Sequence, residues 1–247
     1  MTALTFAMFA LLVLVTHVIG GVAGFGGTLL GLAAVTWVGV ALPTAAPALL
    51  LAGSVQSVYV LAVRRAHVAR GPLGRMLLLA AAGVPLGVLA AARLDRQMLT
   101  IVFALVSVAS GLTHFAPKPR GGARARRVVA DWLLVAAGAL HGAFAAGGAP
   151  AVVAARVLVP EKQAFRATMF GFWVVLNAVV IAAYLSAGRY DRPVMTLTAV
   201  AIPAVVIAML LAERVAARLS QAAFARFVAA LLVLAGGLTL VRAVWDG

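Results

Sequence analysis

The sequence contains no cysteine and very few acidic residues. The absence of cysteine excludes disulfides, thiolate metal sites and cysteine nucleophiles. Only 6 of the 247 residues are Asp or Glu, and all of them lie in predicted loops or near the ends of apolar runs. We therefore expect no carboxylate at mid-membrane depth, where coupling to protons or sodium through an acid would need one. The shortage of oxygen anions also argues against a path for metal cations, and it predicts neither a metal site nor a cofactor.

Charged residues of either sign are scarce as well. They make up 11% of the chain, against 65% hydrophobic residues and a mean hydropathy of +1.12, whereas soluble domains carry about 25% charged residues. Such a chain cannot cover its surface with polar groups, so we predict a multi-pass protein of the cell inner (cytoplasmic) membrane, with lipid as its solvent. The net charge of +14 comes from short basic clusters between apolar runs. Cytoplasmic loops of membrane proteins carry such clusters, and nucleic-acid binding is not expected.

Motifs of known enzymes are also missing. The chain has no His-Glu-x-x-His run, no Gly-x-Ser-x-Gly elbow and no phosphate-binding loop. With so few acids, chemistry by paired carboxylates has little material. We therefore predict that the protein is not an enzyme.

Apolar runs follow one another along the chain. A helix that crosses a bilayer needs about 20 residues, and shorter runs can be interfacial or re-entrant. The first Arg or Lys is Arg64, so the first run lacks the basic flank of a signal peptide and is expected to be a permanent span. The predicted runs are 4–21, 28–40, 45–63, 76–92, 98–115, 128–146, 151–159, 164–186, 195–212 and 224–241.

The two halves of the chain repeat one order of features. Each has a long run, a glycine-rich break, a short run, a proline and three further long runs. We predict an all-α, polytopic transmembrane bundle of two internal repeats, residues 1–115 and 128–247, joined by a basic cytoplasmic linker, 116–127. The distribution of basic loops favours a second repeat that is inverted relative to the first, as in many secondary transporters. The short runs could either span the membrane or re-enter it.

The two glycine-rich breaks are the strongest candidates for a binding site. A break followed by a short helix directs free N–H groups and the positive end of the helix dipole at one place. Two such ends near the midplane would make an anion site. The candidate residues are Gly26, Gly27, Thr28, Gly147 and Gly148. The alternative is that the glycines only allow close helix packing, since small residues also recur at a spacing of four.

Polar residues inside the spans are the second group of candidates. His17 and His141 each precede a glycine break by a few residues, and Gln56 and Asn177 occupy roughly matching positions in the two halves. The histidines could supply a proton or a positive charge, and the amides could donate to a substrate. The alternatives are structural histidines and hydrogen bonds between helices.

Several segments resemble the sulfite exporter TauE/SafE family of membrane transporters. In the first half they are residues 20–30 (GGVAGFGGTLL), 42–46 (LPTAA) and 63–68 (VRRAHV); in the second they are residues 159–168 (VPEKQAFRAT) and Asn177. The resemblance covers nearly the whole chain. It implies export of sulfite, organosulfonates and related small sulfur-containing anions.

Together these features predict a transporter of a small sulfur-containing anion, with export as the expected direction. Its partners would be that anion and membrane lipid, and homo-oligomerisation is left open. The alternatives are an anion-selective channel on the same scaffold and a membrane scaffold subunit that transports nothing.

Overall fold

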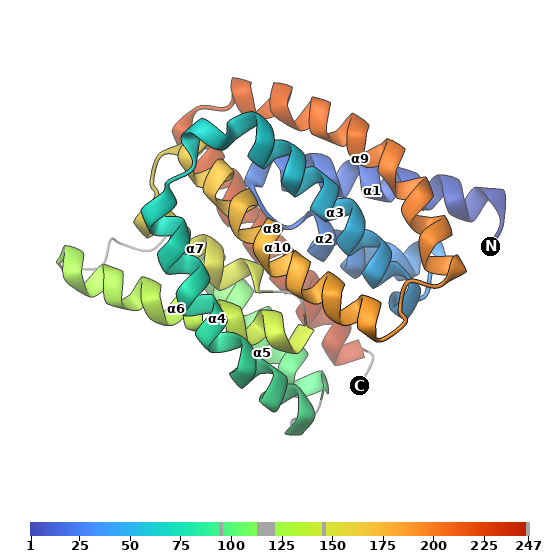
Figure 1. The fold of residues 1–247 in the computed structure, drawn as a ribbon, viewed down its shortest axis with the longest axis horizontal. Helices are drawn as coiled ribbons and strands as arrows, with labels where there is room; N and C mark the ends of the chain where they lie inside the picture. Colours follow the sequence, from blue (N-terminus) through green and yellow to red (C-terminus); the bar gives the residue numbers. More distant parts are fainter. Residues whose placement is uncertain (94–95, 113–121, 145–146, 246–247) are drawn as a thin grey trace. The chain divides into compact units, whose positions relative to one another are not determined.

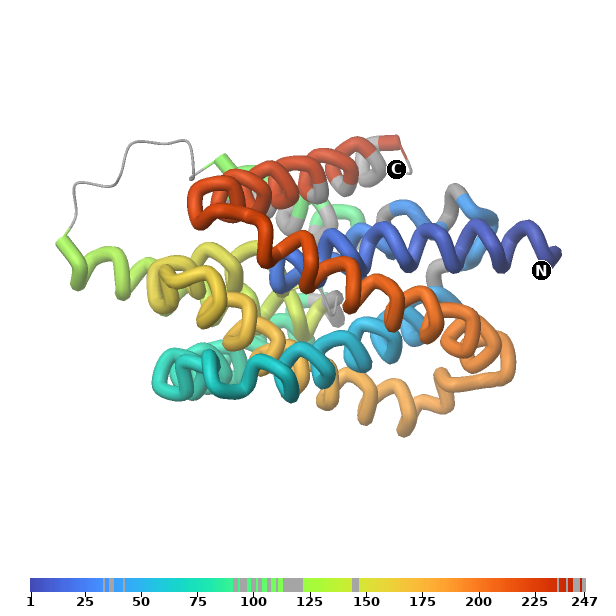
Figure 2. Tube along the Cα trace, turned by 90° about the horizontal axis from the view of Figure 1, so that it is seen from above, coloured from blue at the N-terminus to red at the C-terminus, as the bar shows by residue number. Residues whose placement is uncertain are grey.

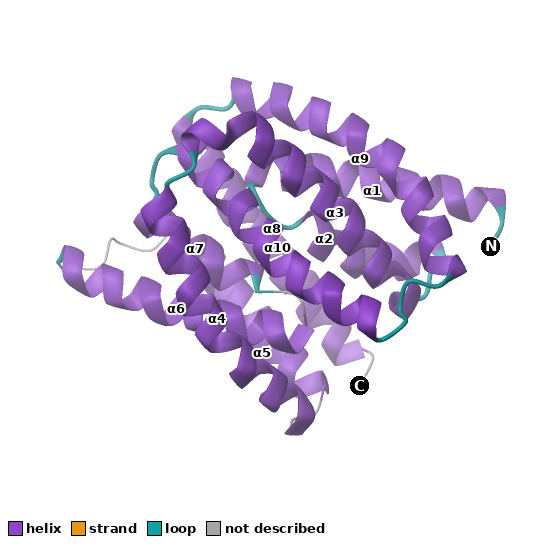
Figure 3. Ribbon diagram, in the orientation of Figure 1, coloured by secondary structure: helices purple, strands orange, loops and turns teal. Residues whose placement is uncertain are grey.

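The computed structural model describes residues 1–93, 96–112, 122–144 and 147–245, and these residues form helices and short connections with no strand (Figure 3). The predicted apolar runs are helical where they are described, except at the ends of the two short runs, residues 39–40 and 159. The α-helices in chain order are α1 (Ala3–Ala23), α2 (Gly27–Ala34), α3 (Leu42–Arg64), α4 (Arg70–Arg93), α5 (Arg96–Leu112), α6 (Ala123–Phe144), α7 (Gly148–Leu158), α8 (Lys162–Ser186), α9 (Arg192–Arg218) and α10 (Gln221–Trp245). Two 3₁₀ turns, η1 (Val35–Val38) and η2 (Arg65–His67), also lie in the described chain.

Each α-helix begins before its predicted apolar run, and α4 and α6 begin furthest before it. α4 begins at Arg70, and α6 begins at Ala123, so part of the predicted 116–127 linker is helical. Arginine is a good helix former, and glycine and proline are concentrated before Ala123. The charged residues at these positions therefore extend the helices beyond their apolar parts. The rest of the linker up to residue 121 lies outside the described residues.

The protein is a multi-pass membrane protein. Among the described residues, 6 helices are long and apolar enough to cross a bilayer, and they belong to α1, α3, α4, α8, α9 and α10. Large apolar side chains cover their outer faces: Leu4 is 69% exposed, Leu78 72% and Val179 57%. In water such faces would be unfavourable, whereas lipid tails are as apolar as these side chains.

The described chain divides into two compact units, each built from both halves of the sequence. The first unit comprises Met1–Ala66 and Phe170–Leu219. In it α1 packs along α9, which in turn packs against α3 (Figure 1). Phe9 and Val13 of α1, Leu49 of α3, and Leu197 and Val205 of α9 are fully buried in its core.

A short turn joins α8 to α9 in this unit. Asp191 caps α9 by accepting a hydrogen bond from the backbone N–H of Val194 at 3.0 Å. The rings of Tyr184 and Tyr190 meet edge to face, with centroids 6.4 Å apart. Burial, with a smaller effect of Tyr184, raises the pKa of Tyr190 to about 12. The Tyr190 phenol therefore stays neutral at physiological pH.

The second unit comprises His67–Met169 and Ser220–Gly247. α4 packs on α6, and α5 packs on α10 (Figure 1). The first helix of each half thus packs on the fourth helix of the other half, α1 on α9 and α6 on α4. Pro85 and Pro203 lie inside these two fourth helices.

Glycines bring α4 and α6 into backbone contact. A Cβ atom at Gly83 would lie 2.0 Å from the carbonyl oxygen of Val135, and one at Gly138 would lie 1.9 Å from that of Ala80. Gly87 and Gly142 repeat the contact one helical turn further along. The four glycines form two small-xxx-small pairs that face each other, so any side chain there must push the helices apart.

We expect Gly138→Ala to destabilise the protein, because overpacking of a tight contact costs about 1–3 kcal/mol. Gly237→Ala in α10 is the matched control, since no atom lies within 4 Å of the added methyl group. There the better helix propensity of alanine should leave stability equal or higher. The measurement is the Tm of each purified variant in detergent. Equal Tm values for the two variants would contradict the close contact of α4 and α6.

Candidate functional site

The chain reverses direction between α1 and α2. Gly24 ends α1 with φ +83° and Gly26 precedes α2 with φ +91°, a backbone region that side chains rarely allow. The predicted glycine break is therefore present. α2 then runs back beside α1, as the blue and light-blue segments show in Figure 2.

The start of α2 lies against the last turns of α1. A Cβ at Gly20 would come within 2.5 Å of the backbone nitrogen of Gly27, so glycine is required at position 20. A Cβ at Gly27 would lie 3.3 Å from the carbonyl oxygen of Thr16 and 3.5 Å from the ring of His17. The first turn of α2, with its positive dipole end, thus adjoins the turn of α1 that carries His17.

The imidazole of His17 is fully buried and its two nitrogens differ. Nδ1 lies 3.0 Å from the carbonyl oxygen of Val13. Because a carbonyl can only accept, Nδ1 must carry the proton, and Nε2 of the neutral ring is left as an acceptor. Nε2 has no hydrogen-bond partner among the described residues. A buried acceptor without a donor is uncommon, so this atom is a candidate contact for a ligand or a proton.

Three groups from α2 and α3 surround this part of α1. The amide nitrogen of Gln56 donates to the carbonyl oxygen of His17 at 2.8 Å. A Cβ at Gly53 would lie 3.7 Å from Nε2 of His17 and 2.7 Å from the hydroxyl oxygen of Thr28. The Thr28 hydroxyl makes a long hydrogen bond of 3.4 Å to the carbonyl oxygen of Leu49. His17, Gly27, Thr28 and Gln56, all predicted from the sequence, are therefore neighbours in the first unit.

Two residues of α8 bond to the other helices of this unit, one of them at the break. The indole nitrogen of Trp173 donates to the carbonyl oxygen of Gly24 at 2.9 Å. Asn177 donates to the hydroxyl oxygen of Ser54 at 3.2 Å. Gln56 and Asn177 were predicted as a matched pair, and both lie in the first unit, but they bond to different groups. Each makes the hydrogen bond between helices that the alternative interpretation expected.

Sequence reasoning did not single out Trp173 or Gly53 for the site. Trp173 had a recognisable signal, since an indole N–H inside a membrane needs an acceptor and a helix break leaves carbonyl groups free. Nothing in the sequence indicated which carbonyl it would reach. Gly53 had no signal beyond being a small residue three positions before the predicted Gln56.

The second break lies in the second unit, and the residue before its short helix differs in conformation, since Gly147 has φ −73° and Gly26 has φ +91°. Gly147 precedes α7, and a Cβ there would lie 2.1 Å from the carbonyl oxygen of Ala137 and 3.1 Å from Cβ of His141. Gly148 is the first residue of α7, and His141 is 4% exposed. The start of α7, like that of α2, is therefore close to the histidine-bearing turn of the preceding helix. Residues 145–146 of the predicted break lie outside the described residues.

None of the described carboxylates lies at either break. Asp131 pairs with Arg75, and Glu213 pairs with Arg64. Asp191 caps α9, and Glu161 accepts hydrogen bonds from the backbone nitrogens of Gln163 and Ala164 at the start of α8. Asp95 and Asp246 lie outside the described residues. The described acids are thus engaged away from the two breaks, and among the described residues the breaks present donors without an opposing anionic side chain.

A multi-pass helical membrane protein with two interrupted helix pairs is the class that this fold defines. A family model described as "Sulfite exporter TauE/SafE" matches residues 8–239, nearly the whole chain. The chain belongs to the TauE/SafE sulfite exporter family and is a membrane transporter. Comparison with curated proteins and comparison with solved structures each returned no match.

Trp173→Phe should lower the Tm of the purified protein. The change keeps an aromatic ring but leaves the buried carbonyl of Gly24 without this donor, which costs about 1–3 kcal/mol. Trp132→Phe is the matched control, because the Trp132 side chain is 69% exposed on the outer face of α6. If both variants have the Tm of the wild type, Trp173 does not stabilise the break.

Proposed function

We propose that this transporter carries small sulfur-containing anions, such as sulfite or organosulfonates, out of the cell across its inner membrane. The observation that carries the proposal is the break between α1 and α2, where a helix N-terminus adjoins a buried histidine with a free acceptor nitrogen. The family's description agrees with that chemistry. We propose His17, Gly26, Gly27 and Thr28 as substrate contacts, with Gln56 and Asn177 holding their helices in position.

The donors of this site suit an oxyanion. The first N–H groups of α2 have no partner within the helix. The N-cap residue is Gly26, which has no side chain that could accept their hydrogen bonds. Oxyanions accept several such N–H bonds at once, and the dipole of α2 adds a favourable field. The hydroxyl of Thr28 can join them if it gives up its long bond to Leu49.

The acceptor of this site selects among oxyanions. Nε2 of neutral His17 can accept a hydrogen bond from a protonated anion, or it can take the proton itself. A fully deprotonated, weakly basic anion such as sulfate offers no such hydrogen. The sulfonate group is as weakly basic as sulfate, so among the proposed substrates the site favours sulfite, which is partly protonated near neutral pH. The site also provides a place for a proton that moves with the substrate.

We propose that the second break binds anions in the same manner. Gly147 and Gly148 would supply the backbone N–H groups, and His141 would lie where His17 lies in the first. α1 packs on α9, and α6 packs on α4 in the equivalent way. This equivalence supports the proposal that residues 1–115 and 128–247 arose by duplication, each with one break. Gly148→Leu tests this break separately from the first.

Purified protein in liposomes should take up labelled sulfite with saturable kinetics, and unlabelled sulfite should compete. Thr28→Val keeps the side-chain shape but removes the hydroxyl, and Gly27→Leu forces a side chain against Thr16 and His17. Each should lower the initial rate about tenfold, the effect of losing about 1.4 kcal/mol of substrate binding. Gly237→Leu is the control, because its surroundings are open.

Other outcomes of the same assay decide between the alternatives. Single-channel currents without saturation would identify an anion channel. Absence of flux for sulfite, thiosulfate, sulfoacetate and sulfate in folded protein would favour the scaffold subunit. Normal flux in both Gly27→Leu and Thr28→Val would place the substrate path elsewhere.

An imposed pH gradient should change the rate of sulfite uptake, and His17→Asn should remove that dependence. The asparagine amide can replace Nδ1 in the bond to Val13 but has no atom at the position of Nε2. His67→Asn is the matched control, because His67 is exposed in η2. The readout is the ratio of initial rates with and without the gradient. An unchanged ratio in His17→Asn would exclude His17 as the proton acceptor.

A further inference from the structure

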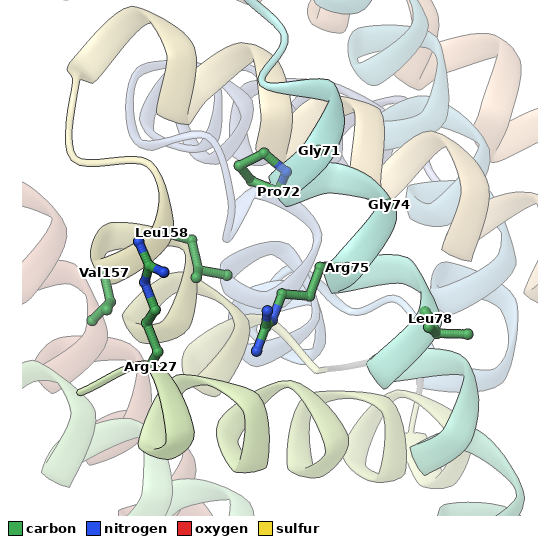
Figure 4. A pocket seen from close by; sticks show the side chains of 8 residues that line it. All are labelled: Gly71, Pro72, Gly74, Arg75, Leu78, Arg127, Val157 and Leu158. Atoms are coloured by element: carbon green, nitrogen blue, oxygen red, sulfur yellow. The ribbon is translucent and has the colours of Figure 1, made fainter. Parts of the chain in front are cut away.

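The second unit holds a cavity that the proposed transport site does not use. Its volume is about 410 Å³, within the range of sites for small molecules. It lies beside the first turns of α4, the first turns of α6 and the end of α7 (Figure 4). The residues that carry the inference are Gly71, Gly74, Arg75, Leu78, Arg127 and Leu158.

Two arginines from different helices line this cavity. Nε of Arg75 donates to a carboxylate oxygen of Asp131 at 2.7 Å, and Nη2 of Arg75 bonds to the other oxygen. Since a guanidinium has donors on all three nitrogens, Nη1 of Arg75 is left available by this pairing. Arg127, exposed near the start of α6, makes no recorded hydrogen bond or ion pair within the described part of the chain. The lining thus carries one guanidinium, that of Arg127, whose charge no described carboxylate neutralises.

The rest of the lining leaves room for an amphiphilic anion. No atom lies within 4 Å of a Cβ placed on Gly71 or Gly74, so the first turns of α4 are open on that side. Leu78 and Leu158 add apolar surface next to the arginines. The start of α4 also contributes the positive end of a helix dipole.

We propose that this cavity binds a phosphate group, held by Arg127 and by the free nitrogen of Arg75. Guanidinium groups match phosphate oxygens in charge and in hydrogen-bond geometry. The mixed lining and the volume favour the headgroup of an anionic phospholipid, whose glycerol and upper acyl chains cover the leucines. Basic pockets between membrane helices bind such headgroups in other proteins. A free phosphate ion offers the same chemistry without the apolar part.

The test is thermal stabilisation of the delipidated, full-length protein in detergent. The probes are dioctanoyl phosphatidylglycerol, dioctanoyl phosphatidylcholine and inorganic phosphate. Phosphatidylglycerol should raise the Tm saturably, and phosphatidylcholine, whose choline would face the arginines, should not. Arg127→Gln should weaken the apparent affinity about tenfold, the usual effect of losing a charge-assisted hydrogen bond. Arg126→Gln, one position away and outside the cavity lining, should match the wild type.

A second pair of variants tests the cavity itself. Gly74→Glu places a carboxylate in the open space and should abolish the response, whereas Gly74→Gln, of nearly equal size, should reduce it less. Inorganic phosphate could raise the Tm as much as phosphatidylglycerol does, and this rise could depend on Arg127. That result would confirm the phosphate site and identify a free oxyanion as its ligand. The proposal is overturned if no probe raises the Tm, or if Arg127→Gln and Gly74→Glu respond like the wild type.

Discussion

The break between α1 and α2 exists because backbone groups inside a membrane must find partners without water. The reversal at Gly24–Gly26 frees backbone groups from their helical hydrogen bonds. Each such group that finds no other partner in hydrocarbon costs on the order of several kcal/mol. The carbonyl of Gly24 receives the indole N–H of Trp173, and that of Gly26 receives the N–H of Leu30. Because α8 and α2 itself supply these donors, the reversal has a defined geometry. The N–H groups at the start of α2 are left for another acceptor.

The distribution of charge favours an anion as that acceptor in the proposed site. The described carboxylates pair with arginines or accept hydrogen bonds at helix N-termini, away from the two breaks. The interior of the first unit contains His17, Thr28 and Gln56 instead, which are neutral. Under the proposed function, a neutral interior with a helix dipole would attract a small anion without a fixed opposite charge to hold it there. A transporter needs this balance.

The helices and the breaks could be predicted from the sequence because both follow from local patterns. Apolar runs of bilayer length give the spans, and Gly24 and Gly26 have the residue type that positive φ requires. The packing alternative for glycine also holds at Gly83 and Gly138, where α4 and α6 touch through their backbones. Glycine-rich composition alone does not distinguish glycines that allow a positive φ from glycines that allow close helix packing.

The partners of the polar side chains could not be predicted, because they depend on which helices meet. The matched order of the two halves suggested that Gln56 and Asn177 serve equivalent roles. In the structure both lie in one unit, where Gln56 bonds to α1 and Asn177 bonds to Ser54 of α3. The helix α6 begins at Ala123, and this early start places Arg127 beside α4 and α7. It could not be predicted either, because the linker is polar and was expected to be a loop.

The most direct test of an anion site at the first break is ¹⁵N NMR of histidine-labelled protein in lipid bilayers, with and without sulfite. The signals of His17 can be assigned by their loss in His17→Asn. The structure predicts a protonated Nδ1 and a bare Nε2 in the absence of ligand, and a shift of the Nε2 signal when sulfite is added. An Nε2 signal that does not move at saturating sulfite would contradict a site beside His17.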